Sequence, residues 1–344
     1  FRNSYTAGRD VFIVKIDPRR DRDQQIVYST FVGGSGNDEP TGIGLDDAGF
    51  VYVCGFTNSD NFPLAGNAFQ GRPGGREDGF VLKLDPRVGG DAGLVYSTYF
   101  GGEAADRATA LVVRNGRIYI TGYTNSNAET FPIAGNARRR DPAGDWDAFA
   151  AIFDPNGGAA SETLLYSTRV GGSRTDAALA LAVDAAGNLL IAGYTASADF
   201  PITQRANPVE FRGATDAFLT RINPASTDLT FSTLLGGSDT DVAYGITIDR
   251  MGAVFLAGHS GSSDFPTTSG APQMGAAGRG DAFVARFFLD RGSEVSALNW
   301  STLLGGEAGD VAYAIDLAEN GDVWIAGYTL SDRFPVRGDA PQRA

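Results

Sequence analysis

The stretch Tyr28-Ser29-Thr30-Phe31-Val32-Gly33-Gly34 decides how this sequence folds, because it occurs five times. Its counterparts run from Tyr96 to Gly102, Tyr166 to Gly172, Phe231 to Gly237 and Trp300 to Gly306. The first aromatic residues of the five stretches are 68, 70, 65 and 69 positions apart. Such a regular spacing indicates a repeat architecture, in which one supersecondary unit is stacked several times. A residue present in every repeat is therefore best explained by the scaffold, and a residue present in one repeat is a better indication of function.

Each repeat contains four short apolar runs separated by turn residues, which predicts four antiparallel strands. The first run follows the double glycine, as in Ala108 to Val113, and Tyr119 to Tyr123 is an example of the second. The third begins at an Asp-x-Phe triplet such as Asp78-Gly79-Phe80, and the fourth is the Tyr-Ser-Thr stretch, polar enough for an outer edge. Tight turns such as Asp46-Asp47-Ala48-Gly49 join the first two runs, with glycine at the position of positive φ.

Four antiparallel strands per repeat, without helical periodicity, predict an all-β protein: a β-propeller of five four-stranded blades. The chain begins with the third and fourth strands of a blade whose first two strands come last. We therefore expect a 2+2 seam of N-terminal and C-terminal strands to close the ring, and residues 1–344 to form a single domain. The predicted repeats are residues 1–34 with 307–344, 35–102, 103–172, 173–237 and 238–306.

Composition excludes several classes of protein. The net charge of −13 and the pI of about 4.5 argue against nucleic-acid binding, because phosphate contacts need clustered cations. No run of apolar residues is long enough for a membrane-spanning helix. Cys54 is the sole cysteine and is expected to be a buried strand residue. No cofactor or metal is expected, because there is one histidine and no Asp-x-Asp-x-Asp-Gly calcium loop.

Longer stretches of the chain resemble the SBBP-type bacterial β-propeller repeat: Leu94 to Gly102, Ala182 to Asn188, Gly193 to Pro201, and Asp281 to Ala285. The resemblance implies a secreted, cell-surface or periplasmic bacterial protein, often part of a larger modular chain. It implies no activity, because the repeat carries no catalytic motif. The family is usually described as seven-bladed, whereas this chain has five repeats. Since the chain opens at Phe1, we expect a processed form or an excerpt of a longer protein.

An aspartate recurs five residues after the first glycine of each pair, just before the first strand of the next blade. In a closed propeller these carboxylates would ring the mouth of the central channel, where they could bind a cation or a polar ligand. Alternatively, each accepts backbone N–H groups within its own glycine-rich loop. The residues are Asp38, Asp106, Asp176, Asp241 and Asp310.

Two further recurrences are expected to be structural. The Asp-x-Phe aspartates should cap the third strand, and they are Asp10, Asp78, Asp147, Asp216 and Asp281. The connection after each second strand begins with a Phe-Pro pair, whose aromatic ring is expected to plug the space between blades. These aromatic residues are Phe62, Phe131, Phe200, Phe265 and Phe334.

Departures from the repeat are better candidates for binding. His259 replaces an aromatic residue, either as a packing substitute or as a ligand contact. The triplet Arg138, Arg139 and Arg140 lies near Trp146 in one connection. A basic triplet beside an aromatic residue could bind an acidic partner or an anionic sugar, and the alternative is a solvated loop.

These features predict that the chain is not an enzyme. A single histidine allows few catalytic sets, and repeat-equivalent aspartates lie in like environments, whereas glycosidases need two unlike carboxyl groups. We expect a non-catalytic extracellular propeller that presents its loops to another protein, as a structural or accessory subunit. The alternative is a multivalent carbohydrate-binding lectin with repeated pockets, and a glycan-active enzyme is third.

Overall fold

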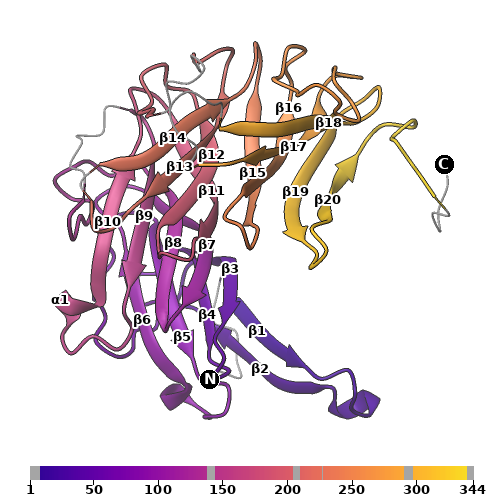
Figure 1. The fold of residues 1–344 in the computed structure, drawn as a ribbon. Helices are drawn as coiled ribbons and strands as arrows, with labels where there is room; N and C mark the ends of the chain where they lie inside the picture. Colours follow the sequence, from indigo (N-terminus) through magenta and orange to yellow (C-terminus); the bar gives the residue numbers. More distant parts are fainter. Residues whose placement is uncertain (1–7, 138–143, 204–209, 227, 290–296, 339–344) are drawn as a thin grey trace. The chain divides into compact units, whose positions relative to one another are not determined.

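The computed structural model describes residues 8–137, 144–203, 210–226, 228–289 and 297–338. Within these residues the chain is all-β apart from the one-turn helix α1 (Ala160–Thr163) and the 3-10 turns η1 (Arg22–Gln24) and η2 (Asp91–Gly93) (Figure 1). No helix in the described part of the chain is long and apolar enough to cross a membrane.

Four repeats form complete antiparallel sheets whose strand order follows the chain, as predicted. We call the strands of each sheet A, B, C and D in that order. The A strands are β3 (Asp38–Leu45), β7 (Asp106–Arg114), β11 (Asp176–Val183) and β15 (Asp241–Ile248). The B strands are β4 (Val51–Thr57), β8 (Arg117–Thr124), β12 (Leu189–Thr195) and β16 (Val254–Ser260). The C strands are β5 (Asp78–Leu84), β9 (Asp147–Phe153), β13 (Asp216–Ile222) and β17 (Asp281–Phe287). The D strands are β6 (Leu94–Phe100), β10 (Leu164–Val170), β14 (Leu229–Leu235) and β18 (Leu298–Leu304).

The turn between strands A and B has the predicted chemistry. Gly49, Gly187 and Gly252 take φ values of 84°, 85° and 83°, which side chains rarely adopt. In the first of these turns, an Asp46 carboxylate oxygen accepts the N–H of Phe50 at 2.9 Å. The side chain and the glycine together close the hairpin and set the register of the two strands.

The predicted four-stranded seam is absent from the described residues. Strands β1 (Val11–Ile16) and β2 (Ile26–Val32) form one two-stranded sheet, and β19 (Asp310–Leu317) and β20 (Val323–Thr329) form another. No ladder of hydrogen bonds joins these two half-sheets. The chain divides into two compact units, unit 1 (Phe1–Asp141 with Phe149–Arg169) and unit 2 (Pro142–Ala148 with Val170–Ala344), and each unit contains one half-sheet.

The core of each unit is built around the phenylalanine of the Asp-x-Phe triplet. Phe80, Phe218 and Phe283 are fully buried. The ring of the Phe-Pro phenylalanine, in the connection that precedes each C strand, is centred 4.6, 4.8 and 4.9 Å from these rings. In the second complete sheet the Phe131 ring also lies 5.2 Å from that of Phe100, which belongs to the preceding sheet. The Phe-Pro ring thus packs between neighbouring sheets, as predicted. Cys54 is buried in β4, as expected.

The first glycine of each Gly-Gly pair is required by a close approach of two carboxylates. A β-carbon on Gly101 would lie 2.4 Å from Asp78 Oδ1 and 2.5 Å from Asp106 Oδ2. The same crowding occurs at Gly33, Gly171, Gly236 and Gly305. Both carboxylates belong to buried strand ends, so neither can move away without breaking hydrogen bonds.

We therefore expect Gly101→Ala to destabilise the protein by about 1–3 kcal/mol, the usual cost of overpacking a tight site. The matched control is Gly71→Ala, because a β-carbon at Gly71 meets no atom within 4 Å. Its free energy of unfolding should stay within about 0.5 kcal/mol of wild type. Urea unfolding of both variants tests this, and equal unfolding free energies would contradict it.

Candidate functional site

The A-strand aspartates are buried at the first residue of each strand, where their carboxylates hold the Gly-Gly loop. In each case one oxygen accepts the N–H of the second glycine of the pair four residues earlier. The donor–acceptor distances are 2.7 Å for Asp38, Asp106 and Asp176, 2.8 Å for Asp241 and 2.9 Å for Asp310. All five side chains are at most 1% exposed. A ligand would reach them only by displacing bonds within the same repeat.

A serine completes each of these sites. It lies two residues beyond the last residue of the B strand, and its hydroxyl donates to the same aspartate oxygen, as Ser262 does to Asp241 at 2.7 Å. The hydroxyl oxygen also accepts a loop N–H, in this case that of Asp239 at 2.9 Å. The equivalent residues are Ser59, Ser126, Ser197 and Ser331. These serines were not predicted, although a Thr/Ser-x-Ser pattern begins at the last residue of every B strand.

The C-strand aspartates face the A-strand aspartates across the first glycine. Around Gly236, Asp216 Oδ1 and Asp241 Oδ2 lie 2.2 and 2.9 Å from the point that a β-carbon would occupy. Around Gly305, Asp281 Oδ1 and Asp310 Oδ2 lie 2.0 and 2.6 Å from that point. The two sets of aspartates, predicted separately, therefore form carboxylate pairs, each between the C strand of one sheet and the A strand of the next.

Burial and mutual repulsion disfavour the charged form of these carboxyl groups. Burial, together with the neighbouring Asp241 carboxylate, raises the pKa of Asp216 to about 7. The pKa values of Asp78 and Asp176 are raised to about 6, again mainly by burial. Hydrogen bonds oppose the shift without cancelling it: they come from glycine N–H groups at Asp78, from Thr195 and Gly172 at Asp176, and from the Arg212 N–H at Asp216.

His259 contacts the backbone of the next repeat. It is half-buried in β16, where the aromatic residues of other repeats lie, and its Nδ1 is 3.1 Å from the carbonyl oxygen of Asp310. Its ring also fills the space beside Gly280, where a β-carbon would meet Cε1 at 2.4 Å. This position links two neighbouring sheets within unit 2.

The basic triplet Arg138, Arg139 and Arg140 lies outside the described residues. Trp146 is half-buried, and its carbonyl oxygen accepts the N–H of Asp176 at 2.8 Å. Trp146 is therefore anchored by its backbone beside the carboxylate pair. Among the described residues, no three histidine, cysteine, aspartate or glutamate side chains gather in an arrangement that could hold a metal ion.

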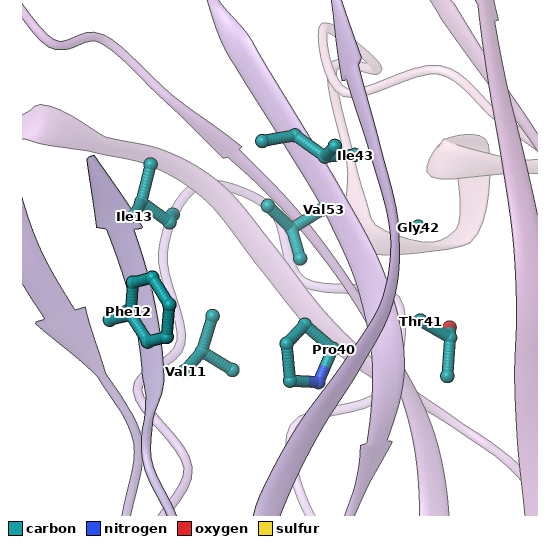
Figure 2. Close-up of a pocket in the computed structure, with 8 residues that line it drawn as sticks. All are labelled: Val11, Phe12, Ile13, Pro40, Thr41, Gly42, Ile43 and Val53. Atoms are coloured by element: carbon teal, nitrogen blue, oxygen red, sulfur yellow. The ribbon is translucent and has the colours of Figure 1, made fainter. Parts of the chain in front are cut away.

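Two hollows in unit 1 are open to ligands. The first, of about 270 Å³, is an apolar groove between β1 and β3, lined by Val11, Phe12 and Ile13 on one side and Pro40 and Ile43 on the other (Figure 2). The second, of about 440 Å³, lies beside the Gly101-Gly102 loop. Its lining includes an aromatic ring and three polar side chains, those of Phe69, Gln70, Glu103 and Thr130.

Ser262→Ala should remove one hydrogen bond to a buried carboxylate and leave the Asp239 N–H without its acceptor. We expect a loss of about 1–3 kcal/mol in the free energy of unfolding, the cost of leaving buried polar groups unpaired. Ser263→Ala is the matched control, because Ser263 is the exposed neighbour. Thermal and urea unfolding measure both, and a Ser262→Ala protein as stable as the control would rule out the serine's role.

Comparison with known proteins shows which repeat parts of the chain resemble. Residues 27–63 and 230–266 match the model of the SBBP β-propeller repeat, which confirms the resemblance seen in the sequence. The regulatory protein FlaEY of Caulobacter vibrioides is 23% identical over 314 residues. That alignment covers 88% of this chain and 30% of FlaEY, so the chain spans less than a third of this curated relative.

Solved structures that match the chain include hydrazine synthase of Kuenenia stuttgartiensis, with a TM-score of 0.42 and 11% identity over 91% of this chain and 67% of that one. They also include CoXyl43, a GH43 β-xylosidase/α-arabinofuranosidase from a compost microbial metagenome, with a TM-score of 0.32 and 12% identity over 85% and 94% of the two chains. An α-L-arabinofuranosidase from Lactobacillus brevis has a TM-score of 0.35 and 11% identity over 87% and 85%.

These structures correct the prediction that the chain is not an enzyme. Glycoside hydrolases are among the structures that match it over most of its length. This match assigns no active site. Two segments of the chain thus match the SBBP β-propeller repeat, and the described residues contain four four-stranded antiparallel sheets.

Proposed function

We propose that residues 1–344 form a single five-bladed propeller that binds another protein at the surface of a bacterium or outside it. The observation that carries this proposal is the burial of the recurring aspartates. All five A-strand carboxylates are engaged by their own loops and are at most 1% exposed. The repeated polar groups are thus occupied within the scaffold, and a ligand must contact residues that differ between repeats. A surface without repetition suits one macromolecular partner.

The B–C connections are the best candidates for this surface. They lie at the end of each sheet that also carries the D–A connections, whereas the A–B turns lie at the opposite end. The two methionines mark the two ends. Met274 is 59% exposed in the connection between β16 and β17, and Met251 is 85% exposed in the turn between β15 and β16. The Arg138 to Arg140 triplet belongs to another B–C connection and is a proposed contact for an acidic partner.

A glycan is the second candidate ligand, favoured by the hollow beside Gly101. Its lining combines the Phe69 ring with Gln70, Glu103 and Thr130, and sugars bind where an aromatic face adjoins polar groups. This lining is only partly repeated. A later repeat keeps the glutamine and the glutamate, as Gln273 and Glu307, but has Pro272 at the position of Phe69. A lectin of this type would therefore have fewer sites than repeats.

Closure of the ring by the two half-sheets is supported by comparing equivalent positions. Phe12 is 69% exposed, whereas the phenylalanines at the same position of the complete sheets are fully buried. Trp324 is 67% exposed, whereas its counterparts in β4, β8, β12 and β16 are at most 6% exposed. The apolar groove between β1 and β3 (Figure 2) lies where a B strand would complete the half-sheet. We propose that β20 fills this place.

The repeat also gives the register of this pairing. Thr57 faces Asp78 and Gly55 faces Phe80 in the first complete sheet, and the same pairs recur in later sheets. Gly327 would then face Phe12, which leaves room for the ring, as Gly55 does for Phe80. Trp324 would face Lys15, just as Tyr52 faces Lys83, whose ammonium lies 5.5 Å from the Tyr52 ring. The proposed register thus repeats two pairings that occur in the first complete sheet.

A photo-reactive amino acid at position 274 should cross-link the protein to one partner protein in its native host, because the B–C connections are the proposed contact. The same substitution at position 251 is the control at the opposite end of the sheets. Mass spectrometry of the adducts, and a one-to-one complex with the purified partner, are the readouts. Equal cross-linking at both positions, or none, would contradict a protein interface there, and glycan binding that depends on Phe69 would favour the alternative.

Paired cysteines test the closure separately. Val14→Cys with Ile325→Cys, and Lys15→Cys with Trp324→Cys, place thiols at adjacent pairs of the proposed register. Because neighbouring antiparallel pairs alternate between two Cα separations, one of the two should form a disulfide readily. We expect a cross-linked monomer on a non-reducing gel. Val14→Cys with Val323→Cys is the control out of register. A disulfide that forms only in this control, or disulfides that form only between two molecules, would contradict the seam.

A further inference from the structure

The carboxylate pair around Gly236 is a place where two negative charges are buried against each other. Asp216 and Asp241 are 1% and 0% exposed. One oxygen of each lies within 2.9 Å of the point where a β-carbon on Gly236 would be. Asp241 Oδ2 accepts from Gly237 N at 2.8 Å and from Ser262 Oγ at 2.7 Å. Asp216 Oδ2 accepts from Arg212 N at 2.9 Å.

The remaining oxygen of Asp216 is the unusual atom. Asp216 Oδ1 is buried, lies on the same side of Gly236 as Asp241 Oδ2, and has no hydrogen-bond partner among the described residues; the same holds for Asp241 Oδ1. A buried carboxylate oxygen without a donor is costly, and it usually signals a missing proton, water or ion. Asp281 Oδ1 has the same environment around Gly305.

Two carboxylates alone make a poor cation site. No group of three histidine, cysteine, aspartate or glutamate side chains among the described residues could hold a metal ion here. A proton needs no further ligand, and a protonated carboxyl group donates a hydrogen bond that a neighbouring carboxylate accepts.

The charged groups around the pair do not neutralise it. Arg212 precedes the C strand and has an exposed side chain, and half-buried His259 lies on the adjacent B strand. Both favour the ionised carboxylates, whereas the Asp264 carboxylate opposes ionisation of Asp216. No salt bridge joins Asp216 or Asp241 to a cation among the described residues, so two full negative charges would be left facing each other.

We propose that Asp216 and Asp241 share one proton at neutral pH, and that this proton stabilises the junction between the C strand of one sheet and the A strand of the next. Loss of the proton at alkaline pH leaves two repelling carboxylates and loosens the junction. The Asp281–Asp310 pair is built in the same way, whereas in the Asp78–Asp106 pair the Asp78 oxygen beside Gly101 accepts the N–H of Gly74. This inference concerns the scaffold and does not depend on the proposed partner.

The sign of the pH dependence follows from the direction of the shift. Burial raises the pKa of Asp216 to about 7 from an ordinary value of 3.8. The folded protein therefore holds a proton that the unfolded chain has released. The resulting stabilisation is complete below about pH 4 and is lost as the pH rises through about 7. Asp78, with a pKa raised to about 6, contributes in the same direction in unit 1.

The test uses Asp216→Asn, whose amide can donate a hydrogen bond to Asp241 at every pH. Asp228→Asn is the matched control, because Asp228 is exposed in the same repeat. One proton is linked to folding of wild type but not of Asp216→Asn. Between about pH 5 and 7, the ratio of the wild-type folding equilibrium constant to that of Asp216→Asn should therefore fall roughly tenfold for each pH unit. The Asp228→Asn protein should follow wild type. Equal slopes for wild type and Asp216→Asn would overturn the proposal.

A second measurement on the wild-type protein does not depend on the variant folding. Carbon-13 NMR of aspartate carboxyl carbons should show a buried carboxyl group that titrates near neutral pH. Infrared spectra at about pH 6 should contain the C=O stretch of a protonated carboxylic acid, which shifts in deuterium oxide. A protein whose aspartates all titrate near their ordinary pKa of about 4 would exclude a shared proton.

Discussion

A buried aspartate at the start of each A strand is the constraint on which the rest of the structure depends. Each carboxylate accepts the N–H of a glycine four residues earlier and the hydroxyl of a serine 20 or 21 residues later. The serine in turn accepts a loop N–H, which ties the end of the B strand to the crossing between sheets. Burying a carboxylate is costly unless such donors surround it. The polar network thus fixes where one sheet ends and the next begins.

This constraint explains which residues the repeat keeps. The first glycine of each pair has no side chain because two carboxylates meet there, and the second supplies the N–H that one of them needs. The C-strand phenylalanine and the Phe-Pro ring cover the apolar side of the same strand ends. Polar and apolar layers therefore meet at one edge of each sheet, where the chain crosses to its neighbour.

Much of the fold could be predicted from the sequence because its determinants are local. Alternating apolar runs, turn glycines at positive φ and the five-fold spacing define the strands and their order. The serine of each polar site was missed, because its role depends on contacts with residues more than 20 positions away. The pairing of Asp216 with Asp241 was missed for the same reason. Closure of the half-sheets involves contacts between distant parts of the chain, which periodicity alone does not determine.

Residues shared by all repeats and residues that differ between repeats have different roles. Repeated aspartates, serines and glycines are occupied within the scaffold, so they offer little to a ligand. Individual residues in the B–C connections carry the differences between repeats, and they include Met274 and the arginine triplet. A scaffold of this kind can carry binding or catalysis, because the loops vary while the sheets stay constant.

Hydrogen exchange at the second glycine of each pair tests the central claim most directly. If buried aspartates anchor these loops, the amides of Gly102, Gly172 and Gly237 should exchange as slowly as core strand amides, although they lie outside the strands. Residue-resolved NMR measures this, with the amide of the exposed Gly71 as the internal reference. Exchange of the three glycines as fast as Gly71 would show that the aspartates do not hold the loops, and the account would fail.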